Sequence, residues 1–379
     1  MHSSTVDNWD GQGWLTSMLK PSDLQRDLPE LCEKLAKSVK LEHLFALTDA
    51  NAVIQHARFS VPYKKEGYAV DDNARALVFS VRAPRYWPDE RLPELQKKLL
   101  SFLLLMQDDN GQLHNFMDFS LDLIGKPTIG DHLGRTLWAT GAILNSTVAE
   151  GVKATARLVF DRALPWARVS DSLRTKAYAC LALRERMLAE PDDKNLETDL
   201  KEISTDLLKA YQANKDGEWQ WYEDALTYDN ARLSQAMLAG YELLHDDLLL
   251  SAGEETLRFL NSAEAQNGIC TPIGNNGWYT KGKAKALYDQ QPIEPGALVE
   301  AAAIAYRLTH DRFYEDMARR ALGWFFGMNT KNVIVYDVAS GGSYDGVGER
   351  GLNQNQGAES TIAFLLAAEE FLTCFAHEK

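Results

Sequence analysis

The chain of 379 residues predicts an all-α fold, an (α/α)6 toroid of six inner and six outer helices with small β hairpins in the loops at its functional end. Three observations predict this ring. A run of small and apolar residues with helical spacing recurs six times, roughly 40–65 residues apart, which is the length of a helical hairpin plus a loop. Charged, amphipathic stretches lie between these runs, and long loops alternate with short turns.

The inner helices are predicted from runs that are rich in Ala and Gly, because a helix that is packed on every side has no polar face. Each run follows a loop that ends in carboxylate, amide or glycine residues. The six runs begin near Asp72, Gly134, Thr175, Asn230, Gly296 and Gly357.

The outer helices are predicted from stretches with one polar face. Five of them begin near Glu94, Lys153, Leu196, Glu254 and Arg312. The sixth must come from the N-terminal part of the chain, where the stretch that begins at Leu28 has the same character. The last inner helix is therefore expected to pack against the first outer helix and close the ring.

A single domain is expected for residues 30–379, because no Pro- or Ser-rich linker divides the chain and helical repeat toroids grow as one unit. Residues 1–29 are expected to be a partly irregular lead-in segment.

The acidic composition restricts the partners. The formal net charge is −14 and no basic stripe offsets it, which argues against nucleic acid or an anionic membrane and favours a neutral substrate. No stretch is apolar over the length that a bilayer requires, and the N-terminus lacks the pattern of a signal peptide, so a cytoplasmic location is expected.

Cofactor and metal motifs are not found in the sequence. The four cysteines have no paired spacing and are expected to be reduced core thiols. No zinc, EF-hand, phosphate-loop or dinucleotide motif occurs, so neither a metal nor a cofactor is predicted. The glycine-rich stretch near Gly341 is interpreted as a flexible lid.

The long loops are expected to form the functional end of the ring. They cover roughly residues 107–133, 214–229, 265–294 and 329–356, and each enters an inner helix. Since all inner helices must point the same way, these loops and the inner-helix N-termini gather at one end, where free N–H groups favour polar ligands. Asn-Gly and Asp-Gly pairs in these loops predict β hairpins.

Aromatic residues in these loops predict a carbohydrate cleft, because a pyranose ring has apolar faces and a rim of hydroxyl groups. Packing of the loops onto the ring is the alternative role. The residues are Phe116, Trp219, Trp221, Tyr222, Trp278, Tyr279 and Tyr344.

Carboxylates at the starts of inner helices are the candidate catalytic groups. Each one taken singly can also act as a helix cap or first-turn acid. The five candidates for catalysis are Asp71, Asp72, Asp229, Glu294 and Glu359. The candidates for substrate binding are Tyr68, Arg75, His114, Asp131, His132, Arg135, Trp219, Trp221, Tyr228, Arg232, Trp278, Tyr344 and Gln356. The three arginines follow acids by three or four residues and can pair with or orient them.

The stretch GYAVDDNARAL resembles the Asp-Asp-Asn motif of the endo-α-1,6-mannanases of glycoside hydrolase family 76, and the six-hairpin plan resembles the toroid of many glycosidases. The resemblance implies that Asp71 and Asp72 are the nucleophile and the acid/base. Arg75 and Ala76 stand where that family has two aromatic residues.

A glycoside hydrolase that acts on oligosaccharides, mannose-containing if the motif resemblance holds, is therefore the predicted function. Two alternatives stay open. His114 and His132 resemble the acid/base histidines of toroids similar to N-acylglucosamine epimerase, which implies a sugar epimerase or isomerase. A helical toroid can also be a non-catalytic protein that binds carbohydrate or protein.

Overall fold

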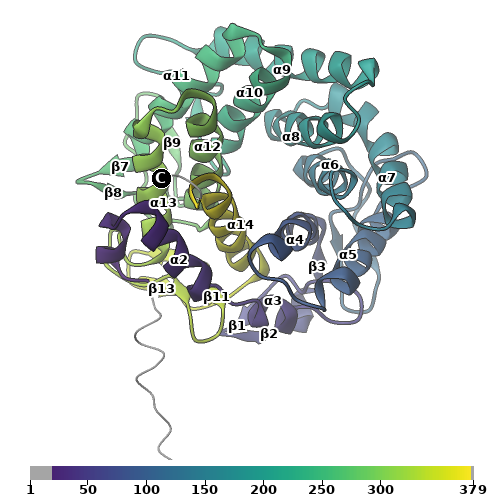
Figure 1. Ribbon diagram of the computed structural model, residues 1–379, viewed down its shortest axis with the longest axis horizontal. Coiled ribbons are helices and arrows are strands. Elements are labelled where there is room, and N and C mark those ends of the chain that lie inside the picture. Colours follow the sequence, from purple (N-terminus) through teal and green to yellow (C-terminus); the bar gives the residue numbers. More distant parts are fainter. Residues whose placement is uncertain (1–18, 377–379) are drawn as a thin grey trace, which may run out of the picture.

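The computed structural model describes residues 19–376 and shows a ring of helices around a central axis (Figure 1). Each inner helix begins within three residues of the start that the sequence predicts. The inner helices are α4 (Val70–Arg82), α6 (Asp131–Leu144), α8 (Leu173–Ala189), α10 (Ala231–Leu244), α12 (Ile293–Thr309) and α14 (Ala358–Phe375). The outer helices are α5 (Leu92–Met106), α7 (Glu150–Val169), α9 (Lys194–Asn214), α11 (Asp247–Glu264), α13 (Arg312–Phe325) and α2 (Leu28–Ser38).

The ring closes as the sequence predicts. Every inner helix packs against the inner helices on both sides of it, and α14 packs against both α4 and α2. Each of the other inner helices packs against the outer helix that follows it in the chain. The predicted (α/α)6 toroid is confirmed.

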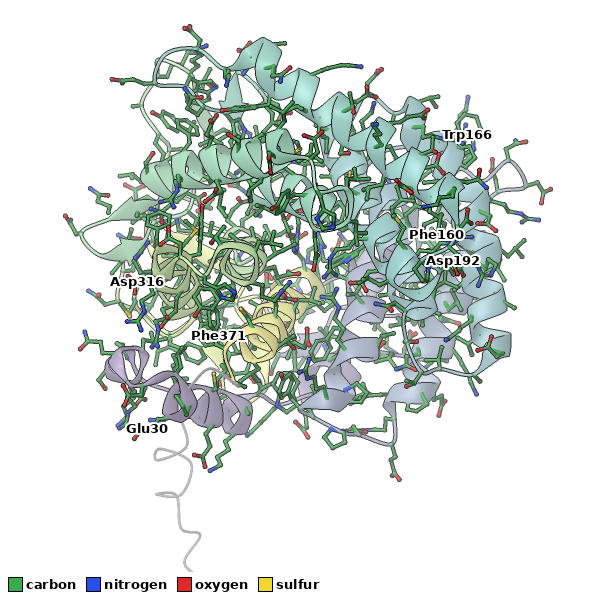
Figure 2. All side chains as sticks on the ribbon, turned by 45° about the horizontal axis from the view of Figure 1, so that its top comes forward. Glu30, Phe160, Trp166, Asp192, Asp316 and Phe371 are labelled. Atoms are coloured by element: carbon green, nitrogen blue, oxygen red, sulfur yellow. The ribbon has the colours of Figure 1, made fainter. Side chains whose placement is uncertain are left out.

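Burial separates the two layers of helices. Inner helices are buried along nearly their whole length, whereas outer helices alternate between a buried and an exposed face. Figure 2 shows the difference, with Glu30 of α2 and Asp316 of α13 at the outside and Phe371 of α14 within the ring. Small residues let the inner helices approach each other. A Cβ atom at Gly134 of α6 would lie 2.8 Å from the carbonyl oxygen of Thr175 in α8.

The predicted β hairpins are present in the loops that enter inner helices. All strands of the described residues pair antiparallel. Strands that follow each other in the chain pair as β1 (Ala57–Arg58) with β2 (Val61–Pro62), β7 (Ala265–Gln266) with β8 (Ile269–Cys270), β10 (Tyr336–Asp337) with β11 (Gly342–Ser343), and β12 (Gly346–Gly348) with β13 (Gly351–Asn353). In the other two sheets, β4 (Phe116–Met117) pairs with both β3 (Tyr68–Ala69) and β5 (Leu123–Ile124), and β6 (Ala225–Leu226) pairs with β9 (Tyr279–Thr280). In the β7–β8 turn, Asn267 and Gly268 both have positive φ, as the Asn-Gly signal predicts.

Short elements complete the described chain. They are η1 (Pro21–Gln25), α3 (Glu42–Leu47), η2 (Lys64–Glu66) and η3 (Ala83–Arg85). Most of the predicted lead-in, residues 1–18, lies outside the described residues, and η1 packs against α13. All four cysteines are free and buried. Within residues 19–376, no helix is both long and apolar enough to cross a membrane. The cytoplasmic location stays a prediction.

Candidate functional site

A cleft opens where the N-termini of the inner helices meet, and it has two lobes. The larger lobe has a volume of about 590 Å³ and the smaller lobe about 220 Å³. Both are lined by Asp71, Gln291 and Glu359, so they adjoin at these residues. A hollow of about 820 Å³ lies elsewhere, between η1, the start of α2 and α13 on the outside of the ring. The cleft is the candidate site because inner-helix N-termini and three of the predicted acids, Asp71, Asp72 and Glu359, converge on it.

Asp71 is held in an ionised state at the junction of the lobes. It lies in the first turn of α4, where the helix dipole favours a carboxylate. Its carboxylate accepts hydrogen bonds from Arg135 Nη1 at 2.5 Å and from Asn115 Nδ2 at 3.1 Å. Burial alone raises the pKa of Asp71, but the guanidinium groups of Arg135 and Arg75 outweigh burial and hold that pKa below its usual value.

Asp72 has the opposite environment, although it is the next residue. It lines the smaller lobe and is 4% exposed. Burial, helped by the charges of Glu359 and Asp71 and opposed by Arg75, raises the pKa of Asp72 to about 8. Arg75 lies between two acids, with Nη1 at 3.1 Å from Asp72 Oδ1 and Nη2 at 3.0 Å from Glu359 Oε2. Two adjacent carboxyl groups therefore differ in protonation at neutral pH, which is the arrangement that separates acid from base roles.

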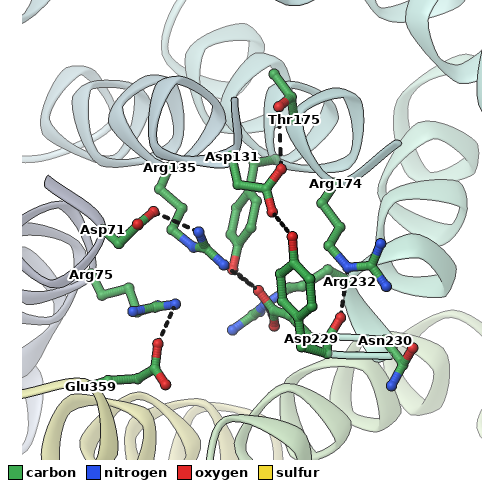
Figure 3. Close-up of polar contacts among 12 residues, drawn as sticks. Asp71, Arg75, Asp131, Arg135, Arg174, Thr175, Asp229, Asn230, Arg232 and Glu359 are labelled. Atoms are coloured by element: carbon green, nitrogen blue, oxygen red, sulfur yellow. Dashed lines mark hydrogen bonds and ion pairs between the residues drawn. The ribbon is translucent and has the colours of Figure 1, made fainter. Parts of the chain in front are cut away.

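Beneath the cleft, a chain of ion pairs (the floor network) runs from α4 through α6 and α10 to α12. Figure 3 shows its first part, from Asp71 through Arg135 to Asp229. Arg135 of α6 joins Asp71 to Asp229, with its Nη2 at 3.0 Å from Asp229 Oδ2. Arg232 of α10 joins Asp229 to Glu300 of α12, at 3.4 and 2.6 Å. Because each buried charge has an opposite charge beside it, the network fixes the position of Asp71 from below.

Asp229 and Glu294, two of the predicted catalytic acids, line neither lobe. Asp229 is fully buried, accepts a hydrogen bond from the Tyr178 hydroxyl and has a φ of 52°. The Glu294 carboxyl group accepts hydrogen bonds from the backbone N–H groups of Asp229 and Asn230 and from Asn230 Nδ2. Burial and nearby acids raise the pKa of Glu294 well above its usual value. The structure therefore assigns Glu294 to holding the start of α10.

Aromatic side chains from two loops form one side of the larger lobe. Tyr228 and Trp278 both line it, with ring centroids 6.3 Å apart. The Tyr228 hydroxyl donates to Asp131 Oδ2 at 2.7 Å. Asp131 also accepts a hydrogen bond from Ser172, the N-cap of α8, at 2.6 Å. Asp131 thus orients Tyr228 and ties α6 to α8.

Several residues that the sequence placed in the cleft lie elsewhere, and this placement corrects the expectation. Trp219, Trp221 and Tyr222 are buried in the core, where Trp219 packs against Phe259 of α11 and against Tyr279. These rings follow a tight turn, but they pack toward the outer helices, where Trp219 and Trp221 both contact Phe259 of α11.

Four further candidates also line neither lobe. The buried Tyr68 donates its hydroxyl hydrogen to Asp49 at 2.6 Å, and Asp49 lines neither lobe. Gln356 bonds to residues of the β10–β11 hairpin, and Tyr344 packs against the core. Arg232 lies in the floor network and is 3% exposed.

The histidines that line the cleft are not the pair that the sequence predicts. His132 lines the larger lobe, but its Nε2 lies 3.0 Å from the Leu113 carbonyl oxygen and 3.2 Å from Thr128 Oγ1. His114 lines neither lobe, and its Nδ1 is buried without a hydrogen-bond partner. His56, which no sequence pattern distinguishes, lines the smaller lobe.

Asp345 also lines the smaller lobe, and it lies in the glycine-rich stretch for which the sequence predicts only a flexible lid. Asp345 accepts hydrogen bonds from Ser360 Oγ at 2.7 Å, from the Gly357 N–H at 3.1 Å and from Asn355. The Asp-Gly pair at 345–346 was a signal for it, because the same pairs mark the other mouth loops. Among residues 19–376, no group of three or more His, Cys, Asp or Glu side chains is arranged to hold a metal ion.

Comparison with known proteins identifies the fold. No family model and no curated protein matches this chain. Among solved structures, it is similar to a sugar epimerase from a ruminal bacterium (TM-score 0.71, 12% identity, 90% of this chain and 99% of that chain). It is also similar to the cellobiose 2-epimerase from Spirochaeta thermophila DSM 6192 (TM-score 0.70, 12% identity, 91% and 98%).

An α-1,6-mannanase of glycoside hydrolase family 76 from Salegentibacter sp. HEL1_6 is similar as well (TM-score 0.62, 12% identity, 92% and 100%). The chain has the six-hairpin toroid fold. At these identities the likeness shows the fold alone, and this fold carries both hydrolases and epimerases among its known structures.

Proposed function

We propose that the protein is a glycoside hydrolase that acts on oligosaccharides, with mannose-containing chains as the first substrates to test. One observation carries the proposal. Asp71 and Asp72 lie side by side at the cleft, the first with a lowered pKa and the second with a pKa raised to about 8. Glycoside hydrolysis needs one carboxyl group that is protonated and one that is ionised.

In the proposed reaction, Asp72 donates its proton to the glycosidic oxygen as the bond to the anomeric carbon breaks. The Asp71 carboxylate then either attacks the anomeric carbon or removes a proton from the attacking water. Arg135 and Asn115 hold Asp71 in position. Glu359 lines both lobes and is a third carboxylate within reach of a bound sugar. Water is the co-reactant, and the anomer of the first product distinguishes retention from inversion.

The test is a screen of aryl glycosides and oligosaccharides, with α-1,6-linked mannooligosaccharides included, followed by substitution of each acid. Asp71→Asn and Asp72→Asn should each lower kcat by about two or more powers of ten, since each group acts mainly in the transition state. The matched control is Asp247→Asn, which removes an exposed first-turn acid of outer helix α11. Full activity in both cleft variants would refute the proposal.

The pH profile of kcat/KM gives an independent readout. The falling limb should lie near pH 8, where Asp72 loses its proton, and the rising limb should lie below pH 3.8, where Asp71 gains one. An activity that increases steadily from pH 7 to pH 10 would contradict Asp72 as the proton donor.

Sugar epimerisation or isomerisation is the second candidate, because His132 and His56 line the two lobes of the same cleft. An epimerase that removes and returns a proton exchanges it with solvent, so incubation of mannose, cellobiose and N-acetylglucosamine in D₂O should introduce deuterium into the sugar. The hydrolase proposal requires no such exchange. Binding of oligosaccharides without either reaction would favour a non-catalytic toroid.

A further inference from the structure

We infer that the enzyme removes one sugar residue at a time from the non-reducing end of its substrate, with the terminal residue enclosed in the smaller lobe. The inference rests on the proposed hydrolase function and specifies its substrate class, a chain with a free terminal residue. It differs from the endo action that the Asp-Asp-Asn resemblance implies.

The smaller lobe is the tighter of the two. Its volume is about 220 Å³, against about 590 Å³ for the larger lobe. The shorter part of a bound sugar chain therefore fits the smaller lobe, and the larger lobe has room for the longer part.

The far wall of the smaller lobe is sealed by hydrogen bonds between two segments that precede α4 and α14. The Ala358 N–H donates to the Gln55 carbonyl oxygen, and the Gln356 N–H donates to the Phe59 carbonyl oxygen, both at 3.0 Å. The Ala57 N–H donates to the side-chain oxygen of Asn355 at 2.8 Å. No sugar chain can pass between these segments without breaking these bonds.

Further hydrogen bonds tie this wall to the segment before α12. The Asp345 N–H donates to the Asn355 carbonyl oxygen at 2.8 Å. Val347 and Gln290 exchange two backbone hydrogen bonds, of 2.9 and 3.0 Å. The close approach depends on Gly346, because a Cβ atom there would lie 2.4 Å from the Gln290 carbonyl oxygen.

The opposite side of the lobe is closed by the sheet beside α4. The Gln55 N–H donates to the Gly67 carbonyl oxygen at 3.0 Å, which joins this segment to the start of β3. Ala69 of β3 pairs with Phe116 of β4, and both residues line the lobe. The lobe is therefore a dead end that opens toward solvent and the larger lobe, past Asp71 and Glu359.

The acids indicate which end of the substrate enters the dead end. Asp71, Asp72 and Glu359 all line the smaller lobe, whereas Asp72 does not line the larger one. The proton donor and the nucleophile or base both act around the anomeric carbon of the residue that is cleaved off. That residue therefore lies in the smaller lobe and is the non-reducing terminus. Polar groups of Gln55 and Asn353 also line it and can bond to sugar hydroxyls.

The experiment uses an α-1,6-linked mannotetraose labelled at its reducing end, and the same compound with a bulky cap on O6 of its non-reducing residue. The first products expected are free mannose and the labelled trisaccharide, with the capped compound uncut. Labelled mono- or disaccharide among the first products, or equal cleavage of the capped compound, would overturn the inference. Any other oligosaccharide that the activity screen identifies can replace this probe in the same design.

Two substitutions, one in each lobe, test where the terminal residue binds. His56→Ala, in the smaller lobe, should lower kcat/KM for di- and tetrasaccharide by the same factor, about tenfold for loss of one polar contact. Trp278→Ala, in the larger lobe, should lower kcat/KM more for the tetrasaccharide than for the disaccharide. The reverse pattern would place the terminal residue in the larger lobe and overturn the inference.

A complete absence of hydrolysis with every probe would refute the proposed function separately. Calorimetric binding of the two mannotetraoses to the native protein would then decide the inference about the lobe. Binding of the uncapped compound, weakened at least tenfold by the cap, supports a closed terminal subsite. Equal binding of both compounds, or binding of neither, overturns it.

Discussion

Asp72→Asn is expected to make the protein more stable at neutral and mildly alkaline pH, although it lowers the activity. The folded-state pKa of Asp72 is about 8, above the usual value of 3.8. Between these two values the folded chain holds a proton that the unfolded chain releases, so the wild-type protein loses stability as pH rises through this window. Asparagine carries no titrating proton and avoids this loss.

The size of the effect follows from the pKa difference. Each pH unit inside the window changes the stability gap between variant and wild type by up to about 1.4 kcal/mol. From pH 5 to pH 7 the variant should therefore gain up to about 3 kcal/mol relative to wild type. The smallest gain in stability expected over this range is about 1 kcal/mol. Arg75 and Glu359 interact with Asp72, so part of the change in protonation is distributed over these neighbours.

Urea denaturation at half-unit steps from pH 5 to pH 8 measures the gap. Asp71→Asn is the control with the opposite sign. Its folded pKa lies below 3.8, so the stability that the ionised group contributes is complete above pH 3.8 and is lost only as pH falls through that lower pKa. Asp71→Asn should therefore be less stable than wild type by a constant amount from pH 5 to pH 8. A constant gap for Asp72→Asn, at the 0.3–1 kcal/mol loss of an ordinary first-turn acid, would refute the raised pKa.

Three further predictions test the placement of other residues. Glu294→Ala removes the carboxyl group that accepts from the first amides of α10, and it should lower the free energy of unfolding in urea by about 3 kcal/mol; a loss below about 1 kcal/mol would contradict this role. Trp221→Ala should lower the free energy of unfolding by about 3–5 kcal/mol, because it leaves a cavity in the core. Trp278→Ala should shift Tm by only a few degrees and change KM. A large loss of stability for Trp278→Ala with a small one for Trp221→Ala would disprove their placement. Gly134→Ala should cost about 1–3 kcal/mol because its Cβ would lie 2.8 Å from a carbonyl oxygen of α8. Gly151→Ala, in open space on outer helix α7, should be neutral or stabilising by up to about 1 kcal/mol, and thermal melts that show equal losses would argue against close helix approach in the ring.

The fold was predictable because its determinants are local in the sequence. Helical spacing, the Ala and Gly content of the inner runs and the polar face of the outer ones specify which helices are enclosed. The turn at Asn267 and Gly268 was predictable for the same reason, since the two residues adopt the positive φ values that their pairing indicates. Ring closure between α14 and α2 was predictable from the number of inner helices together with the amphipathic stretch that begins at Leu28.

The site was predictable only in part. Asp71, Asp72 and Glu359 reach the cleft as expected, because each lies in the first turn of an inner helix. Asp229 and Glu294 occupy similar positions and do not reach it. The local pattern cannot separate these groups, because the difference comes from partners that are distant in the sequence, such as Arg135 and the amides of α10.

The sequence by itself determined the ring of twelve helices, the end at which the polar loops gather and the adjacent pair of acids. Only the tertiary structure decided which acid has the raised pKa, which aromatic rings face the cleft and that one lobe has a wall at its far end. The physical reason is the separation in sequence between the residues that interact. Helix periodicity and turn preferences act between residues a few positions apart, whereas burial, ion pairing and the sealing of a wall depend on segments that meet only after folding. The closed lobe is the extreme case, because its wall joins residues 55–59 to residues 355–358.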